Sequence, residues 1–280
     1  MGKSILRPGM QHIVVSRFNV RMRGFQPRTE EWVRKRLELF RSYAVRSMRS
    51  QTSTCDSWLI FCDAGSRSWF EGPLSDALSE VPQAEPIWTD QAFWDCARDE
   101  ITARVRPGEK LITTRIDTDD AISRGYLGAV QAAASEMRFG ALNFLHGAQL
   151  VGTRVYRRSD PSNMFISFVE QASERPLTVF VDEHHVLEHH GPLVQVRTSP
   201  LWLQVIHEEN IISSVRGIRT SASRVLRDFD LGLTPRETHA EVTLDRVRTS
   251  VRMAIRVVSA PHRLRWALRV LLARGRSKGR

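Results

Sequence analysis

Apolar and polar positions follow two different patterns along the first half of the chain. Compact apolar runs at residues 12–16, 58–62 and 110–116 are rich in β-branched and aromatic side chains, which predicts strands. Between the first two runs, apolar residues recur at helical spacing from about residue 30 to residue 49, which predicts a long helix. Strands alternating with helices are typical of an α/β sheet.

The remaining elements follow from the same signals. Shorter helices are predicted near residues 74–80, 91–104 and 122–137, with Gly72 and Pro73 marking a loop before the first of them. Further strands are predicted at residues 86–88, 140–145, 151–156, 164–169 and 177–182. Because the second half is richer in strands, we expect a Rossmann-like α/β fold whose mixed sheet, flanked by helices, has at least one antiparallel edge.

A basic amphipathic helical tail is predicted from Leu244 onward. Apolar residues share one face and arginines form a stripe on another: Val247, Val251, Ile255 and Val258, against Arg248, Arg252 and Arg256. Pro261 interrupts the helix, and a second apolar face follows it, formed by Leu264, Leu268, Leu271 and Leu272. This pattern divides the chain into a body, residues 1–240, and a tail, residues 241–280.

Almost all of the net positive charge of the chain lies in this tail. Of the net charge of +10, residues 241–280 supply +9 through ten arginines, one lysine and two acidic residues, so the body is nearly neutral. Such asymmetry indicates contact with an anionic surface. For residues 245–280 we favour an anionic membrane surface over nucleic acid, and packing of the tail on the body is an equal alternative.

Length and cysteine usage limit the class of protein. A chain of 280 residues with 41% hydrophobic residues is long enough for a large core and too apolar for general disorder. Its three cysteines form no C-x-x-C pair, which argues against a disulfide framework or a structural zinc site. The N-terminal residues lack the apolar core of a signal peptide. We expect a cytoplasmic protein, peripheral on the inner face of the plasma membrane if the tail binds lipid.

The candidate chemistry lies in the sequence Asp117-Thr118-Asp119-Asp120, directly after an apolar run. On an extended segment, Asp117 and Asp119 project to the same side. Paired carboxylates suit Mn²⁺ or Mg²⁺, which keeps coordination positions for phosphate oxygens and would stabilise a departing diphosphate. The alternative is that Asp119 or Asp120 caps a helix beginning near Ala121.

Four segments, arriving in order, resemble a bacterial rhamnosyltransferase family of the GT-A type. They are residues 12–19, 58–63, 111–122 and 202–210, and the resemblance covers roughly residues 10–220. It implies a GT-A-like fold over residues 1–240 and the transfer of a sugar from a nucleotide-sugar donor.

The resemblance also implies residue roles. The donor nucleotide would lie against Ser16, Arg17 and Asn19, and Asp63 would contact its base or ribose. The metal and the diphosphate would be held by Asp117, Asp119 and Asp120, with Arg115 nearby and His207 completing the metal site. Glu208 follows His207, whereas the family has a small residue at that position. The resemblance therefore does not determine the loop geometry at His207 or its role as a ligand.

An inverting transferase also needs a carboxylate base beside the acceptor hydroxyl. Glu170 closes the apolar run before it and is our first candidate, and Asp182 is the second. Four histidines follow Asp182 closely: His184, His185, His189 and His190. They would allow a zinc site, but this alternative is less favoured because the segment has no H-E-x-x-H pattern.

We therefore expect a metal-dependent glycosyltransferase, with rhamnose as the candidate sugar and a glycan or lipid-linked molecule as the acceptor. One alternative is a metal-dependent phosphoryl-transfer enzyme or nuclease using the same aspartates, although the chain has no P-loop motif and no second carboxylate pair that matches a two-metal site. The other is a non-enzymatic basic protein that binds membrane or nucleic acid through its tail.

Overall fold

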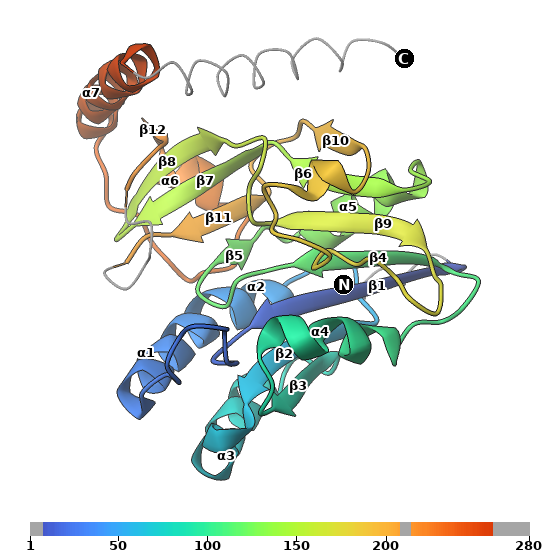
Figure 1. Ribbon diagram of the computed structural model, residues 1–280. Coiled ribbons are helices and arrows are strands. Elements are labelled where there is room, and N and C mark those ends of the chain that lie inside the picture. The colour runs from blue at the N-terminus through green and yellow to red at the C-terminus, as the bar shows by residue number, and fades with distance from the viewer. Residues whose placement is uncertain (1–7, 208–213, 260–280) are drawn as a thin grey trace.

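The computed structural model describes residues 8–207 and 214–259 and contains two sheets (Figure 1). The larger has seven strands in the order β10-β6-β9-β4-β1-β2-β3. Its parallel part consists of β1 (Met10–Arg17), β2 (Ser57–Asp63), β3 (Ala84–Thr89) and β4 (Lys110–Arg115). Antiparallel to β4 runs β9 (Ile166–Gln171), followed by β6 (Gly140–Phe144) and β10 (Leu193–Val196). The predicted GT-A-like mixed sheet is therefore confirmed.

Helices cover both faces of this sheet because its strands carry apolar residues on both sides. Along β1, Val14 belongs to one hydrophobic cluster, whereas Ile13 and Val15 belong to the other, as the two-residue period of a strand requires. The first cluster is closed by α1 (Glu30–Phe40), α2 (Arg46–Arg49), α3 (Arg67–Leu78) and α5 (Tyr126–Ser135), and the second by α4 (Phe93–Thr102). A π-helical turn, Arg41–Val45, joins α1 to α2, so the long helix predicted at residues 30–49 is continuous.

The smaller sheet has five strands in the order β12-β8-β7-β11-β5. They are β5 (Ala121–Ile122), β7 (His146–Val151), β8 (Arg154–Ser159), β11 (Trp202–Val205) and β12 (Ile218–Thr220). Helix α6 (Ala222–Leu226) closes a third apolar cluster against this sheet. Trp202 connects the two sheets, because its indole nitrogen donates to the Phe144 carbonyl oxygen at 2.8 Å and its ring stacks on Phe165 at 5.4 Å.

Several predicted element boundaries are wrong. Helix α3 begins at Arg67 and runs through Gly72 and Pro73, because its buried face packs on the core and overrides their weak helix propensity. The strand predicted at residues 151–156 spans the turn between β7 and β8, where Gly152 has a positive φ of 56°. The helix predicted from residue 122 begins at Tyr126, after β5.

The strand predicted at residues 177–182 is also wrong, since the segment is irregular and Thr178 adopts a φ of 64°. After it come only a 3-10 turn at Leu187–His189 and then β10. Local β propensity therefore did not decide the path of this chain segment, which passes over the sheet as a loop.

The last described helix, α7 (His239–Val258), begins five residues before the predicted Leu244, because Thr238 and Glu241 form a capping box. It packs on β12 at the edge of the molecule (Figure 1). The second apolar face predicted beyond Pro261 lies outside the described residues. Among residues 8–207 and 214–259, no helix is at once long enough and apolar enough to cross a bilayer.

Candidate functional site

The carboxyl ends of β1 and β4 meet where the strand order of the larger sheet reverses. Strand β1 lies between β2 and β4, parallel to both, and the chain continues outward on either side. In an open α/β sheet, the crevice at such a point is the usual ligand position. Arg17 ends β1, and Asp117 follows β4 by two residues, so two of the predicted site residues lie at this crevice.

Asp117 is held by Arg115, whose Nε and Nη2 atoms donate to its carboxylate at 3.1 and 3.2 Å. Burial by itself would raise the pKa of Asp117, but the guanidinium groups of Arg115 and Arg17 outweigh it and lower that pKa to about 2. Asp117 is therefore an anion at neutral pH whose charge is already balanced by arginines.

Asp119 is the residue at which distant segments converge. Its Oδ2 atom accepts from Nη1 of Arg36, on α1, at 2.6 Å and lies 2.9 Å from Nε2 of His207. His207 arrives there because β11 pairs antiparallel with β5, so the residues after β11 run back past the aspartates. The structure thus brings together Asp119 and His207, which are 88 positions apart in the sequence.

Asp120 is bonded to the backbone of β11 and belongs to the framework. Its Oδ1 atom accepts from the Val205 amide at 2.8 Å, which ties the aspartate loop to β11. Burial, together with the negative charges of Asp119 and Asp117, raises the pKa of Asp120 well above its ordinary value. The prediction that Asp119 or Asp120 caps a helix at Ala121 is wrong, because Ala121 begins β5.

The pair of Asp119 and His207 fits a divalent metal. Two adjacent ligands of an octahedral ion, each at about 2.1 Å, lie about 3 Å apart, which is close to the observed 2.9 Å. Mg²⁺ in proteins commonly takes one or two carboxylates and fills its other positions with water and phosphate oxygens. Arg36 shares the same carboxylate oxygen, so a metal ligated by that atom would compete with this guanidinium for it.

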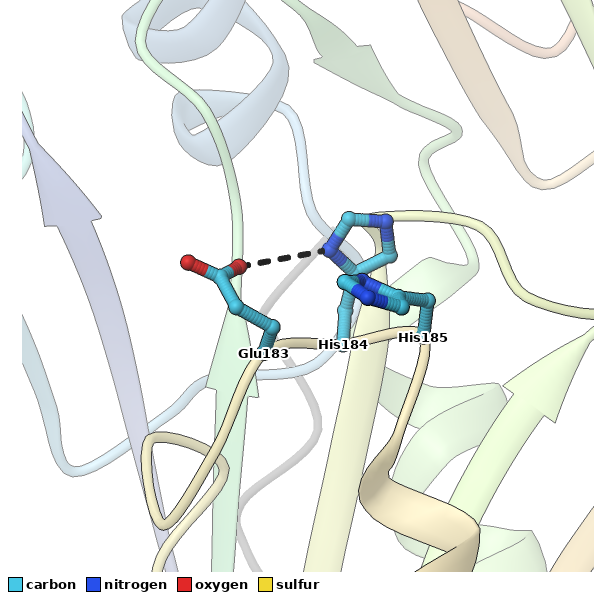
Figure 2. Close-up of side chains that lie close together, drawn as sticks. All are labelled: Glu183, His184 and His185. Carbon is cyan, nitrogen blue, oxygen red and sulfur yellow. Dashed lines mark ion pairs between the residues drawn. The ribbon is translucent and has the colours of Figure 1, made fainter.

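No third acidic, histidine or cysteine side chain within the described part of the chain joins this pair. Among residues 8–207 and 214–259, the one trio of such residues whose ligand atoms lie within 4.8 Å of one another is Glu183, His184 and His185 (Figure 2). Asp117 and Asp120 therefore do not converge with Asp119 and His207 into one metal site, as the family resemblance had implied. Their carboxylates are engaged by Arg115 and by the Val205 amide instead.

Three arginines surround the aspartates: Arg17, Arg36 and Arg115. Burial lowers the pKa of Arg17, and the neighbouring Arg115 guanidinium lowers it further, with Asp117 and Glu183 opposing. Arg17 also stacks over the Phe93 ring at 5.5 Å. Clustered cations of this kind favour a polyanionic ligand such as a diphosphate.

Sequence analysis missed Arg36. It donates from Nε to the Thr118 hydroxyl at 2.9 Å in addition to its bond with Asp119, and its side chain is only 15% exposed. On the predicted helix it is one of several arginines, and helical periodicity alone does not distinguish it from the solvated Arg34. Only the packing of α1 against the aspartate loop identifies it.

Two of the predicted nucleotide contacts are framework residues. Ser16 is buried, donates to the Ile116 carbonyl oxygen at 2.6 Å and accepts from the Trp58 indole at 2.9 Å, so its hydroxyl is not presented to a donor. Asn19, also buried, donates to the Ser66 hydroxyl and accepts from the Asp63 amide. Their predicted contact with the nucleotide does not fit this geometry, because apolar packing turned both side chains inward.

Asp63 caps the short 3-10 turn Ala64–Ser66 through its Oδ1 atom, which accepts from the Gly65 amide at 3.1 Å. The same oxygen is paired with Nε of Arg21 at 3.1 Å. Asp63 lies at the carboxyl end of β2, next to β1, and so on the same edge of the sheet as Arg17. Its predicted role toward the base or ribose stays a prediction.

Glu170, the first candidate for the base, is not at this site. It pairs with Leu111, near the start of β4, and the extended chain covers roughly 20 Å in the six residues from there to Asp117. Both of its carboxylate oxygens accept backbone amides, those of Leu177 and Thr178, at 2.9 and 2.8 Å. The expectation of a catalytic Glu170 is corrected accordingly, since this carboxylate anchors the loop in which Thr178 adopts its positive φ.

The loop that carries Asp182 does reach the site. The neighbouring Glu183 has its Oε2 atom 4.0 Å from Nη1 of Arg115, and the same guanidinium lies 3.4 Å from Nδ1 of His184. Asp182 itself is 44% exposed and is bonded to His190 Nε2 at 3.1 Å. In Figure 2, Glu183, His184 and His185 lie together on this loop. The zinc alternative is disfavoured there because the Arg115 cation faces the same atoms.

Solved structures resemble the chain only weakly. They include the 4-diphosphocytidyl-2C-methyl-D-erythritol synthase of Anaerococcus prevotii, at 9% identity and a TM-score of 0.40, with 86% of this chain and 97% of that one covered. Residues 1–349 of S. aureus TarS match at 7% identity and a TM-score of 0.42, with coverage of 70% and 60%. The inositol-1-phosphate CTP transferase of T. maritima matches at 13% identity and a TM-score of 0.40, with coverage of 82% and 100%. Such low scores carry no argument about function.

The family of the chain follows from its sequence. Among curated proteins, no significant match is found. The sequence model of one family, described as "Putative rhamnosyl transferase", matches residues 12–219, which include most of β1, the aspartate loop, β11 and His207. The alternatives of a phosphoryl-transfer enzyme and of a non-enzymatic binding protein are thereby set aside. The chain belongs to this rhamnosyl transferase family and is a glycosyltransferase.

Proposed function

We propose that this chain is a metal-dependent rhamnosyltransferase that takes its sugar from a nucleotide-sugar donor and transfers it to a glycan or lipid-linked acceptor. The observation that carries the proposal is the Asp119–His207 pair, whose ligand atoms lie 2.9 Å apart at the strand-order reversal. The cofactor is Mn²⁺ or Mg²⁺, because both ions accept a carboxylate and leave positions for phosphate.

The residues around the pair have distinct tasks in this proposal. When bound, the metal would stabilise the negative charge of the departing diphosphate. Arg17 would donate charge-assisted hydrogen bonds to phosphate oxygens, since its guanidinium is close to the aspartates but forms no ion pair with any described residue. Arg36 keeps Asp119 oriented and balances its charge while the donor is absent.

For the acceptor, we propose that the base comes from the loop at residues 182–183 rather than from β9. The Asp182 side chain is 44% exposed, and the hydrogen bond from His190 lowers its pKa, which makes it a weaker base. The Glu183 side chain is exposed to the same degree, at 45%, but it faces Arg115, beside the proposed diphosphate position, although the hydrogen bond with His184 lowers its pKa as well. Asp182 stays a candidate, and Glu183 is the better placed of the two.

Isothermal titration calorimetry tests the metal site directly. The full chain is titrated with UDP, dTDP and GDP, each with and without Mn²⁺, and the strongest ligand is then measured on Asp119→Asn. Mn²⁺ should strengthen binding to the unsubstituted chain, and Asp119→Asn should lose that strengthening because a neutral amide is a poor ligand for a hard cation. The substitution keeps the side-chain shape, so Arg36 retains an oxygen acceptor.

The matched control is Asp76→Asn, at an exposed aspartate near the end of α3, a helix that begins at the carboxyl end of β2 and runs away from it. It should bind the nucleotide with the same dependence on Mn²⁺ as the unsubstituted chain. If Asp119→Asn kept that dependence, the metal would have to bind elsewhere, and the assignment of the site would be wrong.

A further inference from the structure

The outer face of α7 presents a row of apolar side chains to solvent. Leu244, Val247, Val251 and Ile255 are 53%, 57%, 54% and 62% exposed, and their spacing of three, four and four residues places them on one side of the helix. We refer to these four residues as the apolar row. We propose that the apolar row rests on an anionic lipid surface, with the helix lying parallel to it.

The opposite side of α7 is the one that packs on the protein. Val242 is buried, the Thr249 hydroxyl accepts from the Arg219 amide at 3.0 Å, and Nε of Arg246 donates to the Arg219 carbonyl oxygen at 3.3 Å. These contacts fix the helix on β12. Because they use the face away from the apolar row, folding does not require the row, and its apolar character is explained by a partner outside the described protein.

Basic side chains border the row. Arg248 has a side chain that is 63% exposed, and Arg252, one turn further along, is exposed as well. Directly after the described part of α7, the sequence of residues 260–280 adds six arginines and one lysine and no acidic residue. A partner that matches both features must be anionic and must accept apolar side chains, as the headgroup and acyl boundary of an anionic bilayer does.

Other partners fit this face less well. A second copy packed on the apolar row would place the Arg248 and Arg252 side chains of both copies along the same side of the interface. Their positive charges would repel one another there. Residues 260–280 of the same chain are also basic and would be repelled in the same way. Nucleic-acid phosphates would attract the arginines but would leave the four apolar side chains in water.

Vesicle flotation with the full-length chain tests the proposal. Vesicles of equal parts phosphatidylglycerol and phosphatidylcholine should carry the protein upward, and vesicles of phosphatidylcholine alone should not. The double variant Val251→Gln, Ile255→Gln should weaken partitioning by about tenfold, because two apolar side chains no longer enter the boundary. Arg248→Gln with Arg252→Gln should weaken it by about thirtyfold, since each arginine near an anionic surface strengthens binding by a factor of about five.

Two control variants match these changes elsewhere on the surface. Phe25→Gln removes an apolar side chain that is 64% exposed, and Arg227→Gln removes an arginine whose side chain is 75% exposed. Both should float like the unsubstituted chain. All variants replace exposed side chains, so unchanged circular dichroism and nucleotide binding will show that each is folded.

Three results would overturn the proposal. Undiminished flotation of the Val251→Gln, Ile255→Gln variant would exclude the apolar row from binding. A dimer that forms without vesicles and is lost in the same variant would assign the row to a second copy. Binding of duplex DNA that requires Arg248 and Arg252, without binding to either kind of vesicle, would make nucleic acid the partner.

Discussion

At the scale of single residues, the three aspartates of the loop after β4 have three different partners. Asp117 is neutralised by Arg115, Asp119 is shared by Arg36 and His207, and Asp120 accepts a backbone amide from β11. One short acidic motif thus orients an arginine, offers a candidate metal ligand and fixes a strand. Only Asp119 combines a histidine neighbour at ligand distance with a position in the crevice, which is why the test of function is placed there.

His12, a buried histidine on β1, leads to a prediction about the stability of the fold in acid. His12 is fully buried, lies 2.8 Å from the Thr114 hydroxyl through Nε2, and faces the Gln131 amide nitrogen with Nδ1. Burial lowers its pKa to about 4. In the unfolded chain the group takes a proton below about pH 6.5, whereas in the folded chain it stays neutral down to about pH 4.

The unfolded state therefore binds more protons between these two pKa values, and stability falls as the pH drops through this window. We expect His12 alone to reduce the free energy of unfolding by about 3 kcal/mol from pH 6.5 to pH 4. Urea unfolding across this range, compared with His12→Gln, measures the effect: the variant should show a flatter dependence on pH. Parallel curves for the two proteins would contradict the assignment.

At the scale of elements, the position of β11 decides whether His207 reaches Asp119. Strand β11 is held between β7 and β5, and its Trp202 side chain lies directly over Gly147 of β7. A Cβ atom at Gly147 would overlap the indole ring, which is buried between the two sheets and has no room to move. The glycine is therefore needed for close approach of the Trp202 ring.

Gly147→Ala should destabilise the protein by about 1–3 kcal/mol through overpacking, and it should also weaken Mn²⁺-dependent nucleotide binding by displacing β11. Thermal unfolding and calorimetry measure the two effects. Gly72→Ala is the matched control, because Gly72 lies within α3 with open space around it, and alanine is the better helix former there. If Gly147→Ala left both stability and binding unchanged, the indole contact would not position the strand.

At the scale of the whole molecule, the proposed donor site and the proposed lipid-facing surface belong to different segments. The residues of the proposed donor site lie between Arg17 and His207, whereas the apolar row begins at Leu244. Helix α7 contributes to the body chiefly through β12, by its bonds to Arg219. The division at residue 240 that the sequence predicts is therefore testable by truncation.

A chain ending at residue 244 should keep its affinity for nucleoside diphosphate and Mn²⁺, because no donor-site residue is removed. It should lose flotation with phosphatidylglycerol vesicles and melt at a lower temperature, since β12 loses the contacts of Thr249 and Arg246. Calorimetry, flotation and thermal unfolding of the two chains provide the comparison. Loss of nucleotide binding in a truncated chain that is still folded would show that the tail is part of the active site.

The local pattern of the sequence was sufficient for most of the larger sheet. Strands β1, β2 and β4 and the helix at residues 30–49 were predicted correctly, because apolar periodicity reflects which side chains face the core. The aspartate motif was placed correctly at the end of β4 for the same reason. The prediction failed where long-range packing overrode local preference, as in α3 with its glycine and proline and in the irregular segment anchored by Glu170.

The candidate site depends on contacts that no local pattern encodes. Arg36 lies 83 positions before Asp119 and His207 lies 88 positions after it, so their meeting is set by how α1 and β11 pack around the loop. The same packing turned Ser16 and Asn19 inward and carried Glu170 to the far end of β4. The sequence by itself determined the core strands, the acidic motif and the charge of the tail, since periodicity and composition are local. Only the tertiary structure decided which side chains share a site, because that depends on interactions between segments far apart in the chain.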